Sequence, residues 1–104
     1  MNIKILIPVF NDWESLNKLL EEINFLLEEG SEHNFSVFIV NDASTQDRID
    51  APLNLDNLQS VKLINMKENR GHARCNATGL KYIFENEEFD YIIPMDGDGE
   101  DRPE

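Results

Sequence analysis

Two aspartates with one glycine between them form the part of the chain best suited to hold a cation. Asp96, Gly97 and Asp98 directly follow the apolar run 91–95, which is typical of a strand. A strand that ends there presents both carboxylates past its carboxyl end. Carboxylate oxygens suit Mg²⁺ or Mn²⁺, and these ions usually complete their coordination with water and substrate phosphate. The pair therefore predicts a metal site that holds a diphosphate, and hence a nucleotide-activated substrate.

The elements that must position this pair follow from the spacing of apolar side chains, which alternates between strand and helix patterns. In chain order, the predicted elements are a strand at 3–9, a helix at 13–27, a strand at 35–40, a short strand at 61–64, a helix at 71–85 and a strand at 89–95. Asn11 or Asp12 is expected to begin the first helix, and Gly30 to end it. Segment 41–57 is polar and is expected to hold at most a short helix. The buried stripe of the second helix is expected to consist of Ala73, Ala77, Leu80 and Phe84.

Strands that alternate with helices predict an α/β fold with a parallel sheet and right-handed crossovers. The expected strand order is 3-2-1-4, half of a doubly wound, Rossmann-like sheet with helices on both faces, and residues 1–104 are expected to form one domain. In such sheets ligands bind beyond the carboxyl ends of the strands, where the strand order reverses. Polar segments follow all four predicted strands, at 10–12, 41–45, 69–72 and 96–98. The sequence therefore predicts a binding site along this edge of the sheet.

The chain is strongly acidic, with 9 basic and 21 acidic residues and a formal net charge of −12. This charge argues against nucleic acid or an anionic membrane as a main partner. An anionic ligand must then be held by a metal, by helix N-termini or by a few well-placed cations. The apolar runs are far too short to span a membrane, and no leader pattern precedes the first strand. With a single cysteine, Cys75, the chain is expected in a reducing, cytoplasmic compartment, and Cys75 and Met95 are expected in the core.

Four segments in order resemble the family 2 glycosyltransferases, which are nucleotide-sugar enzymes with the GT-A fold. The segments are IPVFN at 7–11, VNDAST at 40–45, NRGHARCNATG at 69–79 and DGD at 96–98. The tail 96–104 also resembles the branch that transfers sugars to polyprenyl phosphates, such as the dolichol-phosphate mannose synthases. The resemblance implies a UDP-sugar or GDP-sugar donor, with the sugar passed to an acceptor hydroxyl or phosphate.

The resemblance also implies roles for individual residues. Asp98 would bind Mn²⁺ or Mg²⁺ on the donor diphosphate, and Asp96 would contact the ribose or a metal-bound water, with Gly97 between them in the donor site. Asp42 would accept a hydrogen bond from the base, for which an ionised carboxylate is suited because it only accepts. Arg70, beside the N-terminus of the second helix, would neutralise part of the diphosphate, with Arg74 as a weaker candidate. The first nucleotide-binding loop would consist of Pro8, Val9, Asn11 and Asp12.

The loop after the second predicted strand departs from the family pattern at two positions. Asn41 stands where many members have an aspartate, and Ala43 where glycine is common. Because of these departures, the resemblance does not determine how the base is bound or whether it is uracil or guanine. Each candidate residue also has a plain structural alternative. Asn11 or Asp12 can simply cap a helix, Asp42 can belong to a turn, and an arginine can face solvent.

In this family the general base lies beyond the metal motif, in the acceptor-binding half. No catalytic residue is therefore expected within 1–104, and the chain is expected to be truncated, binding donor and metal without turnover. The outer edge of the fourth strand is then expected to be exposed and to support a homodimer. The same branch resemblance implies that a longer parent protein can contact the cytoplasmic face of a membrane.

Two other classes stay open on the sequence. A nucleotidyltransferase-like domain also binds nucleotide and Mg²⁺ on an α/β sheet, but it normally has a Gly-rich, basic loop after the first strand, unlike 8–12. A flavodoxin-like or receiver-like module is the second alternative. A receiver carries its acidic cluster after the first and third strands, which fits this order of motifs poorly.

Overall fold

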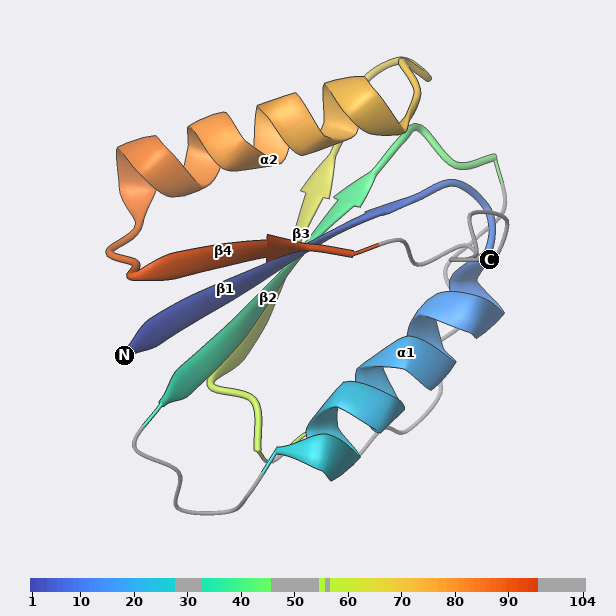
Figure 1. Cartoon of the computed structure of the whole chain (residues 1–104). Coiled ribbons are helices and arrows are strands. Elements are labelled where there is room, and N and C mark those ends of the chain that lie inside the picture. The colour runs from blue at the N-terminus through green and yellow to red at the C-terminus, as the bar shows by residue number, and fades with distance from the viewer. Residues whose placement is uncertain (28–32, 46–54, 56, 96–104) are drawn as a thin grey trace.

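The structure is a computed structural model of the chain, and it describes residues 1–27, 33–45, 55 and 57–95. Six elements follow one another in the order that the sequence predicts (Figure 1). They are β1 (Asn2–Val9), α1 (Trp13–Leu26), β2 (Asn34–Asn41), β3 (Ser60–Asn65), α2 (His72–Asn86) and β4 (Tyr91–Pro94). The strand and helix bounds differ from the predicted ones mostly by one residue. The exception is β4, which is shorter than the predicted 89–95.

The four strands form one parallel sheet in the order β3-β2-β1-β4, which confirms the predicted 3-2-1-4 arrangement. In the register of this sheet, Ile5 of β1 lies opposite Val37 of β2 on one side and Ile93 of β4 on the other. Val37 in turn lies opposite Val61 of β3. Because all strands run the same way, their carboxyl ends lie at one edge of the sheet. The strand order reverses between β1 and β4.

The two helices lie on opposite faces of the sheet, as predicted (Figure 1). Side chains of successive strand residues point to opposite faces, so β1 contributes to two separate cores. Ile5 and Ile7 belong to the cluster under α1, whereas Leu6 belongs with Phe38 to the cluster under α2. All four of these side chains are buried. This two-sided burial explains why β1 and β2 read as continuous apolar runs.

Helix α1 begins at the predicted cap and ends earlier than predicted. The carboxylate of Asp12 accepts a hydrogen bond from the backbone N–H of Ser15 at 3.4 Å. The helix ends at Leu26, which is 78% exposed, and the predicted stop at Gly30 lies outside the described residues. The chain turns to an extended conformation at Leu27. The side-chain amide of Asn57 donates to the backbone carbonyls of Asn24 and Leu27, and so satisfies acceptors that the end of the helix leaves open.

The buried face of α2 is not the predicted one. The residues of α2 with no exposure are Cys75 and Ile83, and Gly79 between them is also buried, whereas Ala73, Ala77, Leu80 and Phe84 are exposed. Gly79 explains the choice of face. A Cβ atom there would collide with the Leu6 side chain and lie 3.1 Å from Cγ2 of Val40, so α2 approaches the sheet most closely at this glycine.

Strand β4 forms one edge of the sheet and, among the described residues, pairs with β1 only. Tyr91 and Ile93 on this strand are 56% and 38% exposed, and Leu80 and Phe84 on α2 are 37% and 70% exposed. Tyr91 and Ile93 pair in register with Ile3 and Ile5 and so point to the α1 face of the sheet, whereas Leu80 and Phe84 lie on the α2 side. No helix among the described residues is long and apolar enough to cross a membrane.

Candidate functional site

The loops after β2 and β3 are joined at the carboxyl edge by a pair of asparagines. The side-chain amide of Asn41, the last residue of β2, donates to Oδ1 of Asn65, the last residue of β3, at 3.0 Å. The backbone N–H of Met66 donates to the carbonyl of Asn41 at 2.8 Å. Oδ1 of Asn41 also accepts from the backbone N–H of Ser44 at 3.0 Å. One amide therefore positions two loops.

The loop after β1 is joined to the loop after β2 by Asn11. Its backbone N–H donates to the hydroxyl of Ser44 at 2.9 Å, and its Oδ1 accepts from the backbone N–H of Thr45 at 2.8 Å. Its amide nitrogen donates to the Thr45 hydroxyl at 3.0 Å. Asn11 and Ala43 have positive φ values of 62° and 54°, a region that L-residues with side chains rarely adopt. The hydrogen bonds hold both turns in these conformations.

Asp42 is buried and binds the loop that precedes α2. The residue is 1% exposed. Its Oδ1 accepts from the backbone N–H of Arg70 at 2.7 Å, and its Oδ2 accepts from the backbone N–H of Gly71 at 2.9 Å. Gly71 is the N-cap of α2 and lacks a side-chain cap, so Asp42 supplies an acceptor from the loop after β2. A carboxylate at a helix N-terminus is also favoured by the helix dipole.

Cys75 lies beneath this cap, one turn into α2. Its side chain has no exposure, which confirms the predicted core position. Burial, the negative charge of Asp42 and a hydrogen bond between the two side chains together raise the pKa of the Cys75 thiol to about 12, and burial contributes most. The thiol therefore stays protonated at neutral pH and is a poor nucleophile. It belongs to the packing around Asp42.

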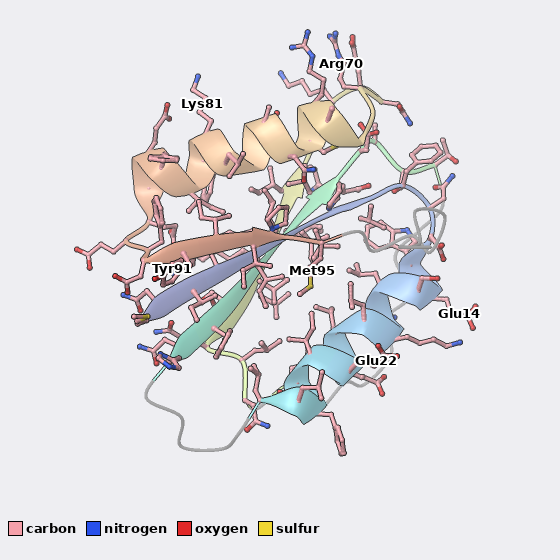
Figure 2. The ribbon with its side chains drawn as sticks, in the orientation of Figure 1. Glu14, Glu22, Arg70, Lys81, Tyr91 and Met95 are labelled. Atoms are coloured by element: carbon pink, nitrogen blue, oxygen red, sulfur yellow. The ribbon has the colours of Figure 1, made fainter. Side chains whose placement is uncertain are left out.

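The Arg70 side chain points away from the sheet at the amino-terminal end of α2 (Figure 2). Its guanidinium lies 2.6 Å from the carboxylate of Glu68, and both side chains are more than half exposed. A shallow pocket of about 260 Å³ lies beside it, lined by Met66, Lys67, Glu68 and Arg70. Arg74, in the first turn of α2, is exposed. A larger pocket at the far end of α1 is lined by two glutamates, Glu21 and Glu22, which makes it a poor place for an anion.

The remaining candidates of the first loop contribute backbone or a cap. Pro8 and Val9 are buried in β1, and the carbonyl of Val9 accepts from the backbone N–H of Asp42 at 2.8 Å. Carbonyls alternate along a strand, so that of Pro8 points toward β4, as does the carbonyl of Leu6, which accepts from the N–H of Met95. Asp12 caps α1. His72, expected as a loop residue, is the first residue of α2.

The predicted metal ligands Asp96 and Asp98, with Gly97, lie outside the described residues. Within the described part of the chain, no three His, Cys, Asp or Glu side chains come close enough to hold a metal ion. The two buried or partly buried aspartates at this edge, Asp42 and Asp12, already accept backbone N–H groups. The metal site therefore stays a prediction for the Asp-Gly-Asp segment.

Three residues of this edge were not assigned to the site from the sequence. Asn65 ends β3 at the level where Asn41 ends β2, and a boundary one residue later would have revealed the pair. Cys75 follows Gly71 by one helical turn, which is the signal for its contact with the cap. Asn76 has a buried side-chain oxygen with no hydrogen-bond partner among the described residues, and no sequence pattern indicates this.

Comparison with known proteins supports the fold and identifies the family. The chain is similar to two crystal structures of S. aureus TarS. One match has 20% identity and a TM-score of 0.69, covering 94% of this chain and 17% of that one. The other, to TarS 1–349, has 21% identity and a TM-score of 0.68, covering 94% of this chain and 28% of that one. The chain thus spans less than a third of either structure, and the likeness establishes the fold, a GT-A-like sheet. Among curated proteins none matches significantly. Residues 4–104 match the profile of Glycosyl transferase family 2, and the chain belongs to that family.

Proposed function

We propose that residues 1–104 are the donor-binding part of a family 2 glycosyltransferase and bind a nucleoside-diphosphate sugar together with Mn²⁺ or Mg²⁺. The observation that carries this proposal is the set of hydrogen bonds at the carboxyl edge. Asn11, Asn41 and Asp42 join the loops after β1, β2 and β3 next to the point where the strand order reverses. A pre-positioned edge of this kind is where doubly wound sheets bind nucleotides.

Because the chain is strongly acidic, local positive features must bind the diphosphate. With a net charge of −12, the general field of the protein repels an anion. The N-terminus of α2 and the Arg70 side chain are the local features that favour one. Arg70 is exposed in its pair with Glu68, so turning toward a phosphate gives up little free energy. We assign it to the diphosphate.

The metal is assigned to Asp98, with Asp96 on the ribose or on a metal-bound water and Gly97 between them. Two carboxylates fit the hard oxygen ligands that Mg²⁺ and Mn²⁺ take in nucleotide sites. When bound, the cation would neutralise negative charge on the departing diphosphate. In the sequence, this Asp-Gly-Asp segment follows β4 after one residue, Met95.

The base contact of Asp42 is the least direct part of the proposal. Each carboxylate oxygen already accepts one backbone N–H, and the Cys75 thiol bonds to a further lone pair, which leaves one acceptor position. At 1% exposure, a direct hydrogen bond from the base requires the base to enter over the Arg70–Gly71 backbone. Pro8 and Val9 would contribute backbone, Asn11 a polar side chain and Asp12 the start of α1 to the same pocket.

The finer assignments rest on the resemblance alone. The tail resembles the polyprenyl-phosphate branch, which suggests a UDP-sugar or GDP-sugar donor, a polyprenyl phosphate acceptor and contact of a longer parent with the cytoplasmic face of a membrane. We assign no catalytic base within 1–104. The small share of the TarS structures that the chain covers is consistent with donor binding here and acceptor binding elsewhere.

Calorimetry of UDP and GDP, with and without Mn²⁺, tests this function. We expect one nucleotide to bind in a metal-dependent way, and Asp98→Ala to weaken that binding by at least tenfold. Glu14→Ala, an exposed acidic position on α1, is the matched control and should leave binding unchanged. Metal-independent binding, or binding that Asp98→Ala does not alter, would contradict the proposal. Metal binding without any nucleotide would favour the receiver-like alternative.

Self-association through the edge of β4 is the second part of the proposal. Exposed apolar side chains flank the β4 edge on both faces of the sheet, Tyr91 and Ile93 on the α1 face and Leu80 and Phe84 on α2. Such edges pair readily with another strand. Two copies joined there would form one continuous sheet. Light scattering at increasing concentration should report a dimer, and Ile93→Lys should shift it toward monomer. A monomer at millimolar concentration would contradict this arrangement.

A further inference from the structure

The second turn of α2 carries a buried acceptor that the fold leaves without a hydrogen bond. Oδ1 of Asn76 is buried and has no partner within the described part of the chain. The residue as a whole is only partly buried. Native proteins rarely bury an unpartnered acceptor, because the group loses its bonds to water without replacement. Such a position needs an explanation in what the protein binds.

The position of Asn76 along α2 places it near the carboxyl edge. Gly79 lies against Leu6 of β1 and Val40 of β2, so α2 passes over the boundary between these strands. Asn76 precedes Gly79 by three residues, which is about 4.5 Å along the helix axis toward the helix N-terminus. Strands rise about 3.3 Å per residue. Asn76 therefore lies about level with Pro8, next to the end of β1.

The position of Asn76 around the helix places it on the β4 side. Residues four apart form a row along a helix, so Asn76 belongs with Leu80 and Phe84. The Phe84 ring packs edge-on against Phe89, just before β4, with centroids 5.0 Å apart. On the other flank of α2, Tyr82 packs against Phe38 of β2 with centroids 6.0 Å apart. The buried amide oxygen thus belongs to the flank where β1 and β4 end.

We infer that Asn76 is a donor-binding residue: its partly exposed side chain turns toward the bound nucleotide sugar, and Oδ1 then accepts a hydrogen bond from a hydroxyl group of that ligand. This inference rests on the proposed function. A neutral amide can accept from a hydroxyl without adding negative charge beside a diphosphate, which a carboxylate at this position would do. The hydroxyl can belong to the ribose or to the transferred sugar. In either case the ligand supplies the partner that the free protein lacks.

Asn76→Leu is the informative variant, because leucine has a similar size, no polar side-chain atom and a higher helix propensity. We expect it to weaken binding of the Mn²⁺–nucleotide complex about tenfold, the usual effect of losing one hydrogen bond to a ligand. The Tm of the ligand-free protein should stay the same or rise, because an unpartnered polar atom is removed. Asn76→Ala serves as a second variant. Asn86→Leu, on an exposed part of the same helix, is the control.

The choice of ligands shows whether the hydroxyl belongs to the ribose or to the transferred sugar. It also separates a failure of the proposed function from a failure of the Asn76 inference. UDP and UDP-glucose are compared, with GDP and GDP-mannose as the second pair. An equal loss for both members of a pair supports the ribose, and a loss confined to the sugar nucleotide supports the transferred sugar. Wild-type protein that binds none of them overturns the proposed function and this inference with it. Wild-type binding that both Asn76 variants retain, or a Tm lowered by both variants but not by the control, overturns the inference alone.

Discussion

The two ends of α2 are both held to the sheet by a carboxylate, but in opposite ways. At the amino-terminal end the carboxylate is that of Asp42, the residue directly after β2. It is 1% exposed and accepts two successive backbone N–H groups, from Arg70 and Gly71. At the other end the carboxylate is Glu87, directly after α2. It lies 3.8 Å from the ammonium of Lys4 and 3.2 Å from that of Lys62.

The two ends differ in how rigid the groups are that bind each carboxylate. Backbone N–H groups have no side-chain freedom, so Asp42 determines where the loop and the first turn of α2 lie. Lysine side chains are long and rotatable, and both ammonium groups also lie over the Phe38 ring, at 5.8 and 5.6 Å from its centroid. Glu87 can therefore hold its end of the helix without determining its exact place. Precise positioning is found at the end that faces the candidate site.

The largest effect is expected from Asp42→Ala. It leaves two backbone N–H groups without acceptors in a buried place, which should lower the free energy of unfolding by about 3 kcal/mol. Asp42→Asn should lower it by about 2 kcal/mol, because its amide nitrogen meets one of the two donors. Urea unfolding monitored by circular dichroism measures both. If Asp42→Ala costs no more than a surface substitution, the amino-terminal end is not held as described.

A smaller effect is expected from Glu87→Gln. Only Lys4 in this cluster is deeply buried, and the Lys62 side chain is 46% exposed, so we expect a loss of about 1 kcal/mol. The loss should shrink in 1 M NaCl, whereas the Asp42→Ala loss should persist, because buried hydrogen bonds are screened little. Unfolding in low and high salt compares the two ends directly. An equal salt dependence for both variants would remove the distinction drawn between them.

The smallest effect is expected from the thiol beneath the amino-terminal cap. Burial and Asp42 raise the pKa of Cys75 to about 12 in the folded protein, against roughly 8.5 in an unfolded chain. Stabilisation by the protonated thiol is therefore complete below about pH 8.5 and is lost as the pH rises toward about 12. Relative to Cys75→Ala, wild-type stability should fall between pH 7 and 9 by less than about 1 kcal/mol. A difference that stays constant with pH would contradict the shift.

The sequence predicts the course of the chain well where local pattern and topology agree. Continuous apolar runs identify β1 and β2, and the cap at Asp12 is a local signal that the structure confirms. The face of α2 is different, because two stripes satisfy the helical period. The exposed stripe contains Leu80 and Phe84, and the buried one contains Gly79. In the sequence, glycine indicates only a weak helix former. The packed structure shows that a residue without a side chain is needed there, because Leu6 lies too close for a Cβ atom.

The sequence by itself determined the strand order, the edge at which the polar loops gather and the family to which the chain belongs. These follow from the order and spacing of residues along the chain. The tertiary structure decided that Asp42 caps α2 rather than standing open at the edge, and that the oxygen of Asn76 is buried without a partner. Asp42 bonds to residues 28 and 29 positions away. Contacts across such distances depend on how the elements pack, which no local pattern encodes. The metal-binding role of Asp96 and Asp98 stays a prediction, because both residues lie outside the described part of the chain.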